Sequence, residues 1–232
     1  NCLMTVQEFH YAVDQGLQKI GSYAYDNFLQ EEIDYWLNRA QERFIKDRAF
    51  AHSDMKQIGF AGNQKRLDDL KNIISIDYLD DALPRVGVEF QEYDLPLNYM
   101  FLINIRAVIR KDKCSPATVT SPQDTVPVRV VNNRDVYFLQ KDPFARSQIE
   151  TPLAILSEQE IKVFQNNESF ILEGIYVDYI RTPAQISLQL NQTSELDDHT
   201  HQEIVDIAVK TMVEAIESPR FQSNPGELSQ TE

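Results

Sequence analysis

Hydrophobic positions recur with a helical period at the start of the chain. Thr5 and Glu8 match a capping box, in which each side chain bonds a backbone N–H group at a helix start. Apolar residues then follow at steps of four and three, at Phe9, Val13, Leu17 and Ile20. The pattern predicts a first helix that Gly21 ends.

The clearest apolar stripe of the chain lies within residues 30–48. It consists of Ile33, Trp36, Leu37, Ala40 and Phe44. The residues predicted to face away from this stripe are Glu31, Asp34, Asn38, Gln41 and Lys46. The spacing predicts a long second helix. A third helix is predicted over residues 63–74, with Asn63 as its cap and Leu67, Leu70 and Ile74 turned inward.

A last helix is predicted near the other end of the chain. Thr200 and Glu203 match a second capping box. One apolar face follows it, made of Ile204, Ile207, Ala208, Thr211, Ala215 and Ile216. Pro219 is expected to end this helix, and a polar linker over residues 189–194 is expected to precede it.

Alternation replaces the helical period in the middle of the chain, where eight of the ten prolines lie between Pro84 and Pro183. Tyr99–Arg110 is predicted to be a strand, because apolar and polar residues alternate along it. Its predicted apolar face consists of Tyr99, Phe101, Ile103, Ile105 and Ile109.

Shorter β-structure is predicted around this strand. Residues 126–131 form a β-branched run, and residues 160–164 and 169–180 are predicted to pair as a hairpin with a bulge at Gly174. Two interpretations of residues 132–140 remain open. Asn132 and Asn133 turn a hairpin, or Asn133 caps a short helix that Asp142 and Pro143 end.

The order of these elements predicts an α+β fold. Helices are expected at both ends of the chain, and a β-rich region is expected between them. The expected divisions are residues 1–75 for the N-terminal helical part, 76–188 for the inserted β-rich region, and 189–232 for the C-terminal helix and tail.

The net charge of the chain bears on whether it binds nucleic acid. The chain of 232 residues has a formal net charge of −14, which argues against gripping nucleic acid by phosphate neutralisation. Its 42% hydrophobic content is typical of a globular protein. With two cysteines, no disulfide framework and no apolar run near 20 residues, we expect a soluble protein made in the cytoplasm, with no membrane partner. Met4 is expected to lie at or near the true start.

Candidate chemistry is sparse. His199 and His201 form the only histidine pair, and an exposed helix start is favoured over a metal site because a third ligand is missing. The acidic pairs at 31–32, 68–69 and 80–81 are expected to be solvated, because adjacent helical residues point in different directions. We therefore expect no metal and no cofactor.

Nucleophile and phosphate-loop signals are also missing. Cys114 lies near Lys111 and Lys113 but has no identifiable base. The seven glycines form no phosphate-binding motif. Arg106 and Arg110, with the two lysines, form the one basic concentration, interpreted as a solvated strand end or as a contact for an acidic patch on a neighbour. We expect no catalytic residues and no enzyme.

Aromatic and apolar residues concentrate in two segments without a clear period. Core packing is the default interpretation, and an assembly interface is the alternative, because aromatics and Met are enriched at interface centres. The candidate interface residues are Tyr23, Tyr25, Phe28, Phe50, Met55, Ile58, Phe60, Arg106, Arg110 and Phe221.

An ordered set of segments resembles the neck proteins of crAss-like tailed phages. The segments are Met4-Thr-Val-Gln-Glu-Phe-His10, Tyr25-Asp-Asn-Phe-Leu29, Trp36-Leu-Asn-Arg-Ala-Gln-Glu-Arg-Phe-Ile45, Asp142-Pro-Phe144, Tyr179-Ile-Arg-Thr-Pro183 and Glu203-Ile-Val-Asp-Ile-Ala-Val209. The resemblance covers most of the chain, from about residue 4 to residue 221.

The resemblance implies an adaptor-type head–tail connector. It also implies that the N- and C-terminal helices form a helical core with an inserted β-rich region. Such subunits form homo-oligomeric rings of typically twelve copies, stack under the portal protein or other neck and tail rings, and extend the DNA channel. The expected location is the virion neck or tail, after synthesis in the host bacterial cytoplasm. An acidic channel wall would let genomic DNA slide without specific binding. The alternatives are another tail-completion or capsid-accessory protein, and a soluble enzyme with an unrecognised site.

Overall fold

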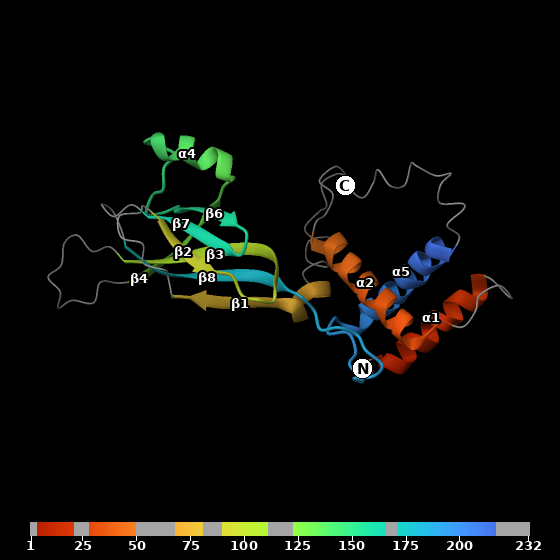
Figure 1. Cartoon of the computed structure of the whole chain (residues 1–232). Coiled ribbons are helices and arrows are strands. Elements are labelled where there is room, and N and C mark those ends of the chain that lie inside the picture. Colours follow the sequence, from red (N-terminus) through yellow and green to blue (C-terminus); the bar gives the residue numbers. More distant parts are fainter. Residues whose placement is uncertain are drawn as a thin grey trace. The chain divides into compact units, whose positions relative to one another are not determined.

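The computed structural model describes residues 4–20, 28–49, 68–80, 90–110, 123–165 and 171–216 (Figure 1). The chain divides into two compact units. The helical unit comprises residues 1–73 and 183–232, and the β unit comprises residues 74–182. The divisions therefore fall at 73/74 and 182/183, where the sequence suggested 75/76 and 188/189. The predicted α+β class is confirmed.

The first helix, α1, spans Val6–Ile20. The predicted capping box is present: the Thr5 N–H donates to Glu8 Oε2 at 2.7 Å, and the Glu8 N–H donates to Thr5 Oγ1 at 3.3 Å. Phe9, Val13 and Leu17 are buried, as the period predicted. The capping bond and the apolar face thus act together to start α1 and to fix which side packs inward.

The second helix, α2, spans Gln30–Ala49. Its apolar stripe is buried at Ile33, Leu37 and Phe44. The prediction that Gln41 faces water was wrong, because its side chain is 2% exposed. Gln41 Nε2 donates to the Ala184 carbonyl, and Gln41 Oε1 accepts from Ser194.

Two further polar residues of α2 bind the same segment, which follows the β unit in the chain and includes Ala184 and Ser194. Asn38 exchanges two hydrogen bonds of 2.8 Å with the backbone of Ile186. Asp34 accepts from the Leu188 N–H at 3.0 Å. Residues 34, 38 and 41 lie on one helical face, so they form a row of partners for an extended backbone. The expected polar linker over residues 189–194 therefore belongs to a segment tied to α2.

The predicted third helix ends at Leu70 and does not reach Ile74. Residues 68–70 are helical, a 3₁₀ turn η1 follows at Lys71–Ile73, and strand β1 begins at Ile74 and runs to Leu79. Ile74 was predicted to end a helix, but its backbone pairs with Ile180. Its β-branched neighbours favour the strand once a partner strand is present.

The last helix, α5, spans Asp198–Ile216. The predicted capping box at Thr200 is wrong: Thr200 lies inside the first turn, and its hydroxyl donates to the Asp197 carbonyl at 2.7 Å. The buried face is rotated from the predicted one, and Ala215 is exposed. The buried residues of the described side chains are Thr200, His201, Ile204, Val205, Ala208, Val209 and Met212. This face packs against α1 and α2.

The β unit consists of two four-stranded sheets. The first has the order β1-β8-β3-β4, with β3 at Tyr99–Arg110, β4 at Gln123–Pro127 and β8 at Ile171–Arg181. The second has the order β2-β7-β6-β5, with β2 at Phe90–Asp94, β5 at Arg129–Val130, β6 at Leu153–Ser157 and β7 at Glu160–Phe164. One apolar cluster combines residues of both sheets, so they pack face to face.

The predicted hairpin between residues 160–164 and 169–180 is wrong. Strand β7 pairs with β6 and β2, and β8 pairs with β1 and β3 in the other sheet. The tight turn lies instead between β6 and β7, where Glu158 adopts a positive φ of 49°. Adjacent strands in sequence can enter different layers of a sandwich when both have buried faces.

Bulges interrupt the register between β3 and β8. One lies between Leu102 and Asn104, and it places Ile103, predicted to be inward, at 44% exposure. Another lies beside Gly174, as the sequence predicted. A Cβ atom at Gly174 would approach the Tyr78 hydroxyl oxygen to 2.5 Å, so the tyrosine ring occupies the space above this glycine.

The ambiguous segment after residue 132 is a helix. Helix α4 spans Asn133–Lys141 and lies beside β6 (Figure 1). Asn132 is its N-cap and makes no side-chain capping bond. Val136 packs with Leu153, Ile155 and Phe164, so one face of α4 covers the second sheet. Helix α4 also connects the parallel strands β5 and β6.

Candidate interaction surfaces and the buried ion network

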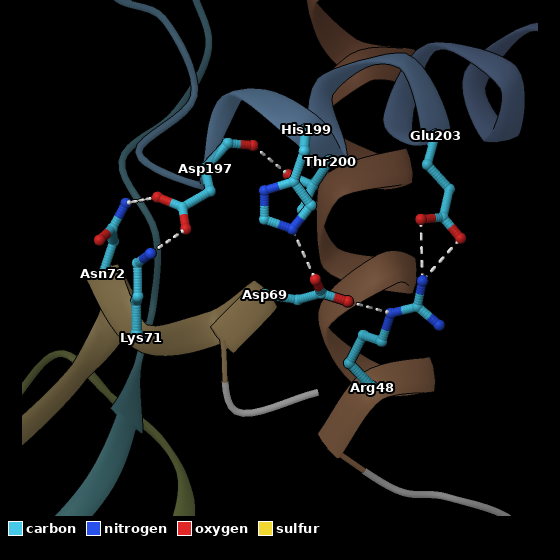
Figure 2. Close-up of polar contacts among 8 residues, drawn as sticks. All are labelled: Arg48, Asp69, Lys71, Asn72, Asp197, His199, Thr200 and Glu203. Atoms are coloured by element: carbon cyan, nitrogen blue, oxygen red, sulfur yellow. Dashed lines mark hydrogen bonds and ion pairs between the residues drawn. The ribbon is translucent and has the colours of Figure 1, made fainter. Parts of the chain in front are cut away.

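A network of charged side chains joins α2, α5 and residues 68–73 within the helical unit. Figure 2 shows Asp69 between His199 and Arg48. His199 Nε2 donates to Asp69 Oδ1 at 2.7 Å, and Arg48 Nε lies 3.0 Å from Asp69 Oδ2. Asp69 is 1% exposed, so its charge needs these partners. The prediction that the 68–69 pair is solvated was therefore wrong for Asp69.

The network continues to the surface on both sides. Arg48 donates to both carboxylate oxygens of Glu203, at 2.7 and 2.8 Å. On the other side, Lys71 and Asn72 both bond Asp197, at 2.7 and 2.8 Å (Figure 2). The hydrogen bond from Lys71 lowers the pKa of Asp197, and the same bond raises the pKa of Lys71. These contacts fasten η1 to the start of α5.

The chemistry available to this network is limited. A histidine beside a buried carboxylate resembles the base half of a nucleophilic site. The Arg48 charge beside the carboxylate opposes that role, because it neutralises Asp69. The hydroxyl of Thr200 donates to a backbone carbonyl, so it is already used. We therefore interpret the network as a structural connection between helices.

The prediction of an exposed helix start holds for His199, which is exposed in the first turn of α5, and is wrong for His201. His201 is 1% exposed, and its Nε2 lies 2.9 Å from the Leu196 carbonyl oxygen, so Nε2 carries the proton. His201 also packs against the ring of Phe9. Among the residues described, no three His, Cys, Asp or Glu side chains group as metal ligands.

The two arginines of the predicted basic cluster are paired within their own sheet. Arg106 Nη2 lies 2.7 Å from Asp178 Oδ1, and its guanidinium stacks over Tyr176. Arg110 Nη1 lies 2.8 Å from Glu173 Oε1. Both acids come from β8, so cross-strand pairing holds these charges in place.

Most of the predicted interface residues lie outside the described part of the chain. These are Tyr23, Tyr25, Phe50, Met55, Ile58, Phe60 and Phe221, and Cys114, Lys111 and Lys113 lie outside it as well. Phe28 is described and is half-buried just before α2. Their role as an interface stays a prediction.

An aromatic and basic surface on α4 was missed by the sequence analysis. We call Arg134, Tyr137, Phe138 and Lys141 the α4 stripe. Their spacing of three, one and three residues places them on one helical face, away from the buried Val136. All four are exposed, with Tyr137 at 61% and Phe138 at 71%. The sequence signal for this surface is the set of aromatic and basic residues at helical spacing. It could not be recognised while residues 132–140 were open to interpretation as a hairpin or a helix.

An acidic and apolar surface lies at the start of α2 in the helical unit. We call Leu29, Glu31, Glu32 and Tyr35 the α2 turn. Leu29 is 68% and Tyr35 is 58% exposed, and both glutamates are exposed. Glu32 Oε2 accepts from the Leu29 N–H at 3.0 Å, which holds the turn in shape. The α2 turn thus has the opposite charge to the α4 stripe.

Comparison with known proteins adds no identification. No protein-family model matches the chain, and no curated protein matches it significantly. In the described residues, no helix is both long enough and apolar enough to cross a membrane.

Proposed function

We propose that this protein is a structural subunit of the neck of a tailed phage. Copies of the chain form a homo-oligomeric ring, with twelve subunits as the expected number. The ring connects the portal protein to the tail, or to another neck ring, and extends the DNA channel. Its work is mechanical, by shape and contact, and it needs no cofactor.

The order of the chain is the observation that supports this proposal most. Both chain ends contribute to the helical unit, and the β unit is one continuous insertion of residues 74–182. The resemblance to crAss-like phage neck proteins implies this same order. An insertion of this kind gives one subunit two compact parts with different surfaces. A closed ring needs such unlike surfaces, because each contact joins one patch to a different patch of the next copy.

The charge distribution is consistent with a channel for DNA. The net charge of −14 comprises about −9 from the helical unit and about −5 from the β unit, so neither part is basic. Phosphates would be repelled by a wall with this charge, so the genome would slide without specific binding. A channel lined mainly by Lys and Arg would contradict this part of the proposal.

Electron microscopy of the purified full chain, alone and mixed with the portal protein encoded with it, tests the proposal. Rings with an open central channel, formed alone or on the portal, are the expected result. The mixture is needed because ring closure can require the portal as a template. A chain that neither assembles nor binds the portal would contradict the proposal.

A further inference from the structure

We propose that the α4 stripe binds the α2 turn of a second copy of this chain. The contact joins a basic, aromatic surface of one copy to an acidic, apolar surface of the next. It deepens the proposed function, on which it rests, by naming the two surfaces that meet between subunits.

The composition of the α4 stripe argues for a partner. A helix that faces water usually carries polar residues on that face. Here two aromatic rings occupy the centre, and Lys141 Nζ lies 4.2 Å from the centroid of the Tyr137 ring. The rings of Tyr137 and Phe138 also touch edge to face. Tyr, Phe and Arg are enriched at protein interfaces, where each aromatic ring buries a large area.

The α2 turn is complementary to the α4 stripe, because it carries acidic side chains where the stripe carries basic ones. Two acids stand opposite two bases in the proposed contact, and two exposed apolar residues stand opposite two aromatic rings. Tyr35 also meets the Trp36 ring edge-on, which supports its exposed position. Complementary charges fix the register and orientation of a contact, and apolar rings exclude water from its centre.

A second copy suits the α4 stripe better than nucleic acid does. Single strands are bound by aromatic platforms within strongly basic grooves. Residues 129–146 contain four bases and two acids, a weak local excess within a chain of net charge −14. That excess is too small for phosphate neutralisation but matches an acidic protein surface. The two surfaces differ, so the contact can repeat from one copy to the next and close into a ring, whereas two reciprocal contacts would close a two-fold dimer.

Site-directed cross-linking between two variants of the full chain tests this contact. Both carry Cys2→Ser and Cys114→Ser. One adds Phe138→Cys and the other adds Tyr35→Cys, and a short bismaleimide joins thiols that meet. The control replaces Phe138→Cys by Leu97→Cys, a fully exposed position elsewhere in the β unit. All changed positions in the contact are exposed, and circular dichroism checks that each variant folds.

We expect the Phe138–Tyr35 pair to cross-link at least about tenfold faster than the control pair. Lys141→Glu should slow that reaction about tenfold, and Glu31→Lys in the other copy should restore it, because the charges are then exchanged. Equal rates for the test and control pairs would overturn the proposal, and so would a missing rescue.

The result also separates this inference from the proposed function. Rings seen by microscopy without the Phe138–Tyr35 cross-link would overturn the contact and leave the ring standing. Cross-linked copies that close only as two-fold dimers would support the contact and overturn the ring.

Discussion

Asp69 is buried, although the adjacent acid Asp68 is exposed. Its two partners, Arg48 and His199, come from segments 21 and 130 residues away in the chain. A pair of adjacent acids gives no local sign of such partners, so a solvated face was the natural prediction. Gln41 was missed for the same reason, because its partners lie on a segment that returns after the β unit.

Removing Arg48 should leave the buried Asp69 charge without its cation. We expect Arg48→Ala to lower the free energy of unfolding of the helical unit by about 3 kcal/mol, since breaking a buried pair is far costlier than breaking an exposed one. Lys46→Ala, which removes an exposed pair with Glu42, is the control and should lower it by about 0.5 kcal/mol or less.

Trp36 is the only tryptophan of the chain and lies in α2, so its fluorescence in urea reports on the helical unit. Similar losses of stability in the two variants would contradict a structural role for the ion network.

The pairing of Asp197 with Lys71 predicts a dependence of stability on pH. The pKa of Asp197 is lowered in the folded state, chiefly by the hydrogen bond from Lys71. Its contribution is therefore present above the unfolded pKa of about 4 and is lost as the pH falls through the lower folded pKa. Asp197→Asn should destabilise the protein at pH 7 and should make little difference near pH 2.

Urea titrations at several pH values measure this difference. Lys71→Met provides the matched background, in which Asp197→Asn should have a smaller effect at pH 7. A difference between the two Asp197 forms that persists unchanged at low pH would show that the charge has no part in it.

Among the helices and strands, those with strong local sequence patterns were predicted correctly, whereas features that depend on distant contacts were not. The capping box at Thr5 and the long period of α2 are local, and both helices formed where they were predicted. The bounds of β3 also matched, because its alternation is long. Strand partners are not local, so the hairpin between β7 and β8 was predicted wrongly. The bulge that exposes Ile103 depends on register with β8, which alternation alone does not reveal.

Gly16 sets how closely α1 approaches α5. A Cβ atom there would come within 2.7 Å of Val209 Cγ2, and the side chain of Val209 is stiff because it is β-branched. Gly16→Ala gains about 0.5–1 kcal/mol of helix propensity but overpacks the contact by about 1–3 kcal/mol. We expect a net loss of stability of about 1 kcal/mol.

Val209→Ala removes the side-chain atoms that a Cβ at residue 16 would meet. It therefore tests whether this contact causes the loss of stability. In that background Gly16→Ala should be neutral or stabilising, which thermal unfolding of the four variants would measure. Additive losses in the double variant would mean that close approach of α1 and α5 is not what Gly16 provides.

At the scale of the whole molecule, the two units have different origins in the chain. The sequence predicted helices at both ends and strands between them, because proline positions and periodicity separate these regions. The candidate surfaces were harder to predict. The α4 stripe became visible only when residues 133–141 proved to be helical. The acidic charge of both units supports the proposed channel, and the order of the chain supports the proposed ring.

We propose above all that this chain forms a ring in the neck of a phage particle. The decisive measurement is cryo-electron microscopy of intact particles of the phage that we propose encodes it, reconstructed around the neck. We expect a ring of copies between portal and tail whose density fits the helical unit and the β unit. Complete particles with no such ring, and no trace of the chain by mass spectrometry of the purified particles, would contradict it.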